Sequence, residues 1–245
     1  MIEVEMKLEL TPRLLAKLQE LFDFLPSVQF INQTYQVDSY YDTQQHTCFR
    51  QAVFLRVRNQ AALEIKYHDS ADPLHTQCIE RVFPLDAEGQ AIEELNVLGT
   101  RFIAGWRKAA SVEEALECNE LSEFVCIEKQ RSHYRYRDVL ICIDTIPGLG
   151  HFLELEISCK EDEEIAWAYD RLQEVLMHFA LSALSVIHQG YVELWLLRYR
   201  PHIYHLVSYP QNGLQKLEIE APPHVSSREE YVEHPKRSGE FPSGK

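Results

Sequence analysis

Within the first ten residues of the chain, apolar and charged side chains alternate without a break from Ile2 to Leu10. Successive side chains of a β-strand point to opposite faces, so Glu3, Glu5 and Lys7 share one face and the apolar residues share the other. The apolar face is ordinary core material. Two like charges on one face repel each other. A face of this kind either looks into water on the open side of an antiparallel sheet or holds a divalent cation.

The same pattern recurs in other strand-like segments. Residues 152–157 contain a second Glu-x-Glu pair, residues 53–58 an Arg-x-Arg pair and residues 63–67 a Glu-x-Lys pair. Either every sheet is half exposed to water, or the charged faces converge on each other. Convergence would suit a metal ion bound together with a polyphosphate, because the cation takes oxygen ligands while Arg and Lys neutralise the remaining anionic oxygens.

Six motifs in this order resemble those of the CYTH family, the triphosphate tunnel metalloenzymes. They are Glu3-x-Glu5-x-Lys7, Tyr40-Tyr41-Asp42-Thr43, Leu55-Arg56-Val57-Arg58, Glu64-Ile65-Lys66, Lys129-Gln130-Arg131, and Asp144 followed by Leu149-Gly150-His151-Phe152-Leu153-Glu154-Leu155-Glu156. Members of the family include thiamine triphosphatases, inorganic triphosphatases and class IV adenylate cyclases. The resemblance spans residues 1 to about 195 and implies an α+β fold, in which a closed eight-stranded antiparallel β-barrel encloses a charged tunnel and helices pack outside. Most small barrels instead fill their interior with apolar side chains.

The resemblance and the face pattern together define two sets of site residues. The acidic set is expected to bind Mg²⁺ or Mn²⁺ through carboxylate oxygens; it comprises Glu3, Glu5, Glu80, Asp144, Glu154 and Glu156. The basic set is expected to bind a triphosphate; it comprises Lys7, Arg56, Arg58, Lys66 and Arg131. Unpaired charges in a narrow lumen are costly, so the two signs must be interleaved.

The resemblance also implies a general base for the attacking water, namely Lys66 with Tyr40 as its partner. A lysine serves as a base only when neighbouring cations or desolvation depress its pKa, and Arg56 and Arg58 would provide those cations. An alternative for Tyr40 is an aromatic side chain packed at the end of a strand. Glu64 shares a face with Lys66, and we expect it to form a local salt bridge or to lie at the surface.

The chain departs from the family pattern near its last helix. Members often place a Lys or Arg just before a terminal Tyr, which corresponds to Tyr191, and Gly190 stands where the family has Ser. Here the preceding residues are His188, Gln189 and Gly190. One phosphate contact is therefore missing or passes to His188.

Composition limits the partners of the protein. The chain has 245 residues and a formal net charge of −14, which opposes binding to nucleic acid or an anionic membrane. A small-molecule triphosphate must be attracted by a local basic cluster. The six cysteines form no Cys-x-x-Cys pair, which favours a reducing, cytoplasmic setting. No apolar run reaches the roughly 18 residues of a membrane span, and acidic residues at the start exclude a signal peptide. A monomer or a homodimer is expected.

The periodicity predicts a tunnel domain over residues 1–197 and an irregular or disordered tail over residues 198–245. Helices are expected at residues 13–25 and 161–180, with interrupted helical spacing between them at residues 91–120. Strands are expected at residues 1–10, 28–43, 53–59, 62–68, 76–85, 124–137, 139–145 and 152–157, and a loop at 68–75.

The leading hypothesis is a metal-dependent triphosphatase acting on thiamine triphosphate or inorganic triphosphate. The first alternative is a class IV adenylate cyclase, which makes cyclic AMP and pyrophosphate from ATP. The cyclase branch often has a His-Phe pair before the opening Glu-x-Glu, and this sequence starts with Met-Ile, so hydrolysis is favoured. The second alternative is a module that binds triphosphates without turnover.

Overall fold

The computed structural model describes residues 2–67 and 77–207. Within them the strands, in chain order, are β1 (Ile2–Leu10), β2 (Val28–Asp42), β3 (Phe54–Arg58), β4 (Ala62–Tyr67), β5 (Gln77–Pro84), β6 (Ser122–Tyr136), β7 (Val139–Ile146), β8 (Gly150–Cys159) and β9 (Val186–Ile187). The helices are α1 (Pro12–Phe24), α2 (Thr47–Arg50), α3 (Gln90–Phe102), α4 (Val112–Cys118), α5 (Ile165–His178), α6 (Tyr191–Tyr199) and α7 (Pro201–Tyr204), and a 3₁₀ turn covers Asp162–Glu164.

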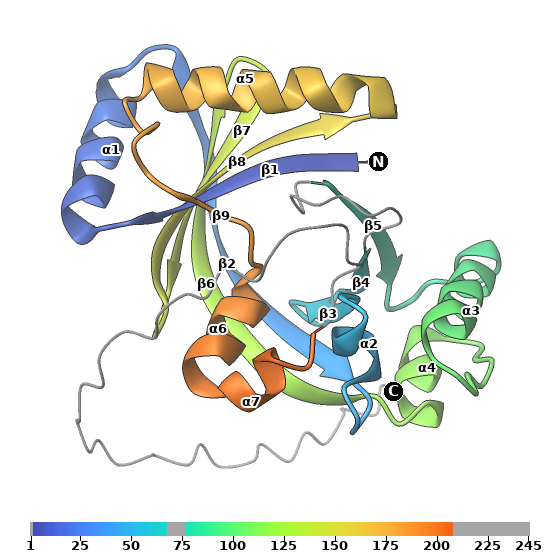
Figure 1. Cartoon of the computed structure of the whole chain (residues 1–245). Helices are drawn as coiled ribbons and strands as arrows, with labels where there is room; N and C mark the ends of the chain where they lie inside the picture. The colour runs from blue at the N-terminus through green and yellow to red at the C-terminus, as the bar shows by residue number, and fades with distance from the viewer. Residues whose placement is uncertain (1, 68–76, 208–245) are drawn as a thin grey trace, which may run out of the picture. The chain divides into compact units, whose positions relative to one another are not determined.

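The strands form a closed antiparallel barrel. Their order is β5-β4-β3-β2-β6-β7-β8-β1, and β5 pairs again with β1, which closes the ring of eight. The closing contact joins Ile2–Val4 to Gln77–Ile79, and β9 pairs further along β1 with Lys7 and Leu8. The barrel in Figure 1 therefore confirms the fold that the sequence resemblance implied.

Alternation along the strands separates an apolar outer face from a charged inner face. Val4, Met6 and Leu8 are buried in an outer core that α1 and α5 cover, and Figure 1 shows both helices beside β1, β7 and β8. The Thr11 side chain caps α1 by accepting a hydrogen bond from the Leu14 backbone N–H at 3.2 Å. The opposite faces of the same strands are free to line the lumen.

A second apolar core lies between α3, α4 and the strands β3, β4 and β5. Its polar centre is the Asn96 amide, whose oxygen accepts hydrogen bonds from the Trp106 indole N–H and the Ala109 backbone N–H. Gly99 allows this arrangement, because an added Cβ would lie 2.2 Å from the Trp106 ring. The helical insertion thereby supports the strands that carry Arg56, Lys66 and Glu80.

The structure corrects the predicted end of the folded part. The sequence placed an irregular tail from residue 198, whereas α6 extends to Tyr199 and α7 follows it at Pro201–Tyr204. Ile203 of α7 is buried in the core around Leu196, and this packing explains why the chain remains helical there. The predicted loop at 68–75 and the rest of the tail, 208–245, lie outside the described residues. No helix in the described ranges combines the length and apolar character needed to cross a bilayer.

Candidate functional site

The barrel encloses a cavity of about 290 Å³ lined mainly by charged side chains. All the predicted site residues except Asp144 line it; they are Glu3, Glu5, Lys7, Tyr40, Arg56, Arg58, Lys66, Glu80, Arg131, Glu154 and Glu156. They come from strands far apart in the sequence. The charged faces therefore converge on a shared interior instead of facing separate patches of solvent.

Carboxylates gather where β1 pairs with β8. Glu5 lies directly opposite Glu156, and Lys7 lies opposite Glu154. The Lys7 ammonium is 3.2 Å from Glu154 and 3.8 Å from Glu5. Burial raises the pKa of Glu156 to about 7, and the neighbouring charges of Glu3 and Glu5 add to the effect. This side of the cavity thus holds more negative charge than its lysine neutralises.

Arginines and one lysine gather on β3 and β4. Arg56 lies 3.1 Å from Glu80 and 2.5 Å from Glu64, and Arg58 also contacts Glu64 at 3.5 Å. Glu64 thus forms the expected local salt bridges, within the cavity wall. The Lys66 ammonium lies between two carboxylates, 3.0 Å from Glu3 and 3.5 Å from Glu80. Each of these basic groups is paired with acidic neighbours, as expected for a narrow lumen in which positive and negative side chains alternate.

Asp144 lies behind the cavity wall and not among its lining residues. It is fully buried, accepts a hydrogen bond from Arg131 Nε at 2.7 Å and another from the Tyr191 hydroxyl at 2.7 Å. The Arg131 guanidinium also contacts Glu154. Asp144 therefore supports Arg131 and Tyr191 from behind the lining residues, and its predicted role as a metal ligand stays a prediction.

Tyr40 lines the cavity and packs in an apolar core with Phe49 and Val125. The packing agrees with the aromatic interpretation, and its role beside Lys66 stays a prediction. It lies opposite Arg56 across the β2–β3 ladder. Burial raises the pKa of the Tyr40 phenol above its ordinary value, even though Arg56 acts in the opposite direction. The phenol is therefore a neutral hydrogen-bonding group at neutral pH.

A family model described as a CYTH domain matches residues 1–191 of this chain. The chain belongs to the CYTH family. The match includes every strand of the barrel and ends at the first residue of α6.

One sequence relative and two solved structures are similar to this chain. A protein of Methanocaldococcus jannaschii, provisionally named an adenylate cyclase, is 35% identical over 68 residues; the aligned segment covers 28% of this chain and 39% of that relative. The structure of the PH1819 protein from Pyrococcus horikoshii matches with a TM-score of 0.56 and 22% identity, over 80% of this chain and 98% of that one. A structure from Vibrio parahaemolyticus, also provisionally named an adenylate cyclase, matches with a TM-score of 0.53 and 20% identity, over 79% of this chain and 97% of that one. These structural likenesses show the fold.

Lys129 and Asp38 are among the charged residues of this CYTH barrel that were not predicted as site residues. Lys129 lines the cavity, is 2% exposed and lies 3.2 Å from an oxygen of Asp38. Burial and the neighbouring Arg131 lower its pKa to about 8. Asp38 also accepts two hydrogen bonds from Arg58, at 2.8 and 3.2 Å. The sequence could have identified Lys129, because it stands two residues before Arg131 on β6 and therefore shares the same face of the strand.

The segment before α6, where this CYTH chain lacks a Lys or Arg, is held by lumenal groups. Lys7 donates a hydrogen bond to the Gln189 carbonyl at 3.1 Å, and Glu193 accepts one from the Gly190 backbone N–H at 2.7 Å. The ammonium groups of Lys7 and Lys129 lie 4.6 and 5.1 Å from the centre of the Tyr191 ring. His188 lines the cavity, and its predicted contact with phosphate stays a prediction.

The carboxylates fit a hard divalent cation that the protein would share with its substrate. In the described part of the chain, no three His, Cys, Asp or Glu side chains converge as a ready set of metal ligands. Mg²⁺ usually takes only one or two carboxylates and completes its shell with water and phosphate oxygens. Facing carboxylates such as Glu5 and Glu156, with Glu3 nearby, match that requirement.

Proposed function

We propose that this protein is a metal-dependent triphosphatase, which hydrolyses the terminal phosphate of thiamine triphosphate or inorganic triphosphate inside the barrel. The observation that carries the proposal is the set of cations lining one cavity, Lys7, Arg56, Arg58, Lys66, Lys129 and Arg131. Guanidinium groups bind phosphate oxygens through paired hydrogen bonds. So many cations in one small lumen suit a ligand with several adjacent anionic groups.

In this mechanism a water molecule attacks the terminal phosphorus in line with the bridging oxygen, whose bond to that phosphorus breaks. Arg56, Arg58 and Arg131 hold the phosphate oxygens and stabilise the charge that spreads over them. Lys66 accepts the proton of the water only when its amine is neutral, a form that the adjacent carboxylates of Glu3 and Glu80 disfavour. The products are orthophosphate and the shortened phosphate ester or diphosphate. Mg²⁺ or Mn²⁺ would be held by one or two carboxylates from among Glu3, Glu5 and Glu156, and it would supply further neutralisation of the phosphate charge.

Adenylate cyclase activity is the second candidate, because the sequence relative from Methanocaldococcus jannaschii is provisionally named an adenylate cyclase. The same charged lumen could bind the triphosphate of ATP. A cyclase would instead direct the ribose 3′-hydroxyl at the α-phosphorus and release pyrophosphate. Hydrolysis is favoured because it requires only the charged groups described above, whereas cyclisation also requires a site that orients the ribose.

A substrate panel tests the proposal. Thiamine triphosphate, inorganic triphosphate and ATP would each be incubated with Mg²⁺, with Mn²⁺ or with EDTA, and orthophosphate, pyrophosphate and cyclic AMP would be measured. We expect orthophosphate from one of the first two substrates, and none with EDTA. Cyclic AMP as the main product from ATP would instead identify a cyclase. Tight binding with no product over several hours would identify a non-catalytic module.

The proposed setting is the cytoplasm. The cysteines for which the structure describes side chains are free thiols; they are Cys48, Cys118, Cys126, Cys142 and Cys159. Cytosolic reductants keep thiols in this state. A highly charged triphosphate does not cross a membrane unaided, so the enzyme and its substrate would have to share one compartment.

Lys129 gives the site a specific pH dependence. We expect KM for the triphosphate to rise as the pH is raised through about 8, because Lys129, whose pKa is lowered to about 8, then loses the charge that attracts phosphate. In Lys129→Met that charge is absent throughout, so KM should be raised roughly tenfold at pH 7, the size of one charge-assisted hydrogen bond. The measurement is steady-state kinetics between pH 6.5 and 9.

Comparing the pH profiles of the wild type and Lys129→Met isolates the contribution of Lys129 to KM, because titration of the substrate affects both proteins equally. Lys17→Met, which removes an exposed lysine of α1, serves as the control and should behave as the wild type. Parallel pH profiles for the wild type and Lys129→Met would contradict the assignment of Lys129 to phosphate binding.

A further inference from the structure

One edge of β2 is left open in the barrel. β2 pairs with β6 along its length but with β3 only over Asp38–Tyr41. At Val37 the β3–β4 turn replaces β3 as the hydrogen-bonding partner. The Asn59 backbone N–H donates to the Val37 carbonyl and the Asn59 side chain accepts from the Val37 N–H, both at 2.8 Å. Among the described strands, none pairs with this edge over residues 28–36.

The geometry of the ladder shows which backbone groups face the open edge. In an antiparallel strand the N–H and C=O of one residue point to the same side, and alternate residues point to opposite sides. The Val37 groups point toward the β3 side, so those of Tyr35 and Gln33 point the same way. No β-strand in the described part of the chain is available to receive them there, and a β-strand is the partner that such a row of donors and acceptors fits.

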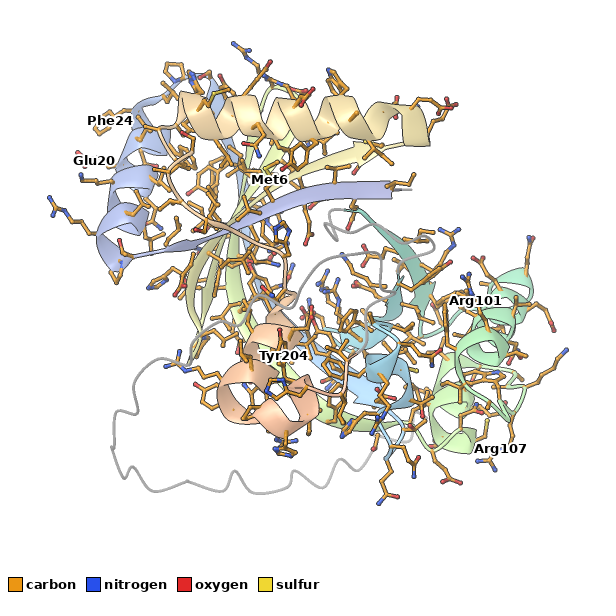
Figure 2. The ribbon with its side chains drawn as sticks, viewed as in Figure 1. Met6, Glu20, Phe24, Arg101, Arg107 and Tyr204 are labelled. Carbon is orange, nitrogen blue, oxygen red and sulfur yellow. The ribbon has the colours of Figure 1, made fainter. Side chains whose placement is uncertain are left out.

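The surface around this edge is apolar and accessible. The exposed fractions are 56% for Phe30, 44% for Ile31 and 59% for Tyr35. Phe24, at the end of α1, is 78% exposed, and Figure 2 shows its side chain pointing away from the barrel. α1 leads directly into β2, because the Val28 N–H donates to the Leu25 carbonyl. The open edge and the apolar residues thus form one surface, which we call the β2 edge surface (residues 24–36).

The charge pattern indicates which partner fits. No charged residue and no histidine occurs between Asp23 and Asp38, although the whole chain has a net charge of −14. Natural monomers usually protect an open edge with lysines or other charges. β2 itself carries none here, and the charge nearest to Tyr35 that the structure shows is Glu128 of β6, which accepts a hydrogen bond from the Tyr35 hydroxyl. A two-fold contact brings the same residues of two copies together, so an uncharged strand is what allows two strongly acidic copies to meet without repulsion.

We propose that the β2 edge surface joins two copies of this chain into a homodimer by antiparallel pairing of β2 with β2. Gln33 of each copy then lies opposite Tyr35 of the other, with the two-fold axis at Thr34. The pairing ends at Val37, because its backbone N–H and C=O are already hydrogen-bonded to Asn59. The β-bulge between Phe30 and Asn32 ends it on the other side. This inference does not rest on the proposed function, because it depends only on the backbone edge and the exposed side chains of β2.

The test compares two substitutions at one position. Tyr35→Pro removes an edge-facing N–H while leaving the pairing with β6 intact, since proline is tolerated on an edge strand whose N–H faces outward. Tyr35→Thr loses the same phenol but keeps the N–H. Sedimentation equilibrium over a concentration series should give twice 28.6 kDa for the wild type and for Tyr35→Thr, and 28.6 kDa for Tyr35→Pro.

A second variant covers the case in which Tyr35→Pro does not fold. In this register Ile31 lies opposite Val37 of the other copy, so Ile31→Asp brings a charge against an apolar side chain at the interface. It should raise the dissociation constant of the dimer at least about tenfold, or about 1.4 kcal/mol. Val97→Asp on α3, where Val97 is 67% exposed, is the matched control and should leave the dimer intact. Hydrogen exchange at residues 33–35 should be slow in the dimer and fast in Ile31→Asp.

Three results would overturn the proposal. One is a wild-type protein that stays monomeric up to about 100 µM, whether its edge amides exchange rapidly or are protected by another part of the same chain. Another is a dimer that Ile31→Asp and Val97→Asp weaken equally. The third is a dimer that persists in folded Tyr35→Pro.

Discussion

Lys66→Arg is expected to lower the turnover of triphosphate hydrolysis by about 10²–10⁴-fold, the usual contribution of a general base. KM should change by less than about threefold. Arginine keeps the positive charge that faces Glu3 and Glu80, but its guanidinium does not give up its proton at accessible pH. The substitution therefore separates the proton-accepting role of Lys66 from its role in binding. Steady-state kinetics with the best substrate of the panel would measure both parameters.

Two further variants complete this experiment. Lys66→Ala loses both roles, so its turnover should fall and its KM should rise. Lys160→Arg makes the same chemical change at an exposed lysine and should have no effect. If Lys66→Arg kept full turnover, Lys66 would not be the base, and Lys129, with its lowered pKa, would be the residue to examine next.

Asp38→Asn is expected to cost roughly 3–5 kcal/mol of unfolding free energy, the range observed when one partner of a buried ion pair is removed. The Asp38 carboxylate is 1% exposed and neutralises Arg58 and Lys129, with Arg56 at 3.8 Å. Asparagine keeps the shape but leaves these cations without their common counter-charge. Urea unfolding followed by circular dichroism would measure the loss.

The pH dependence of this contribution follows from the pKa of Asp38. Burial alone would raise that pKa, but Arg56, Arg58 and Lys129 hold it well below the ordinary value. The stabilisation is therefore present above about pH 4, the pKa of an unfolded Asp, and is lost only as the pH falls toward the lower folded value. Asp138→Asn, at a surface pair with Arg171, should cost less than about 1 kcal/mol. Equal losses in the two variants would show that Asp38 is not the central counter-charge.

Face parity explains why most of the lumen could be predicted from the sequence. A strand has a period of two residues, so Glu3, Glu5 and Lys7 had to share a face with one another, and the buried Val4 and Met6 had to share the opposite face. Alternation is a local property and identifies strands and their faces. The closed barrel was implied by the resemblance of the motif order to the CYTH family, and the structure confirms that barrel.

Whether an inward-facing side chain reaches the cavity or is covered by its neighbours could not be predicted from the strand pattern. Parity assigns Asp144 to the inner face, but it does not show that Arg131 and Tyr191 cover its carboxylate. Tyr191 belongs to α6, and its position over Lys7 and Lys129 depends on how that helix packs against the barrel. Asp38 was missed for a related reason, because a single acidic residue in a long polar strand gives no pattern.

The ring of strands is joined unevenly along its circumference. Among the described residues, β1 pairs with β8 from Ile2 to Leu10 but with β5 over Ile2–Val4 alone. A seam held by so few backbone hydrogen bonds needs less free energy to open than the longer strand pairs. We therefore expect the amide protons of this seam to exchange with solvent earlier than those between β1 and β8.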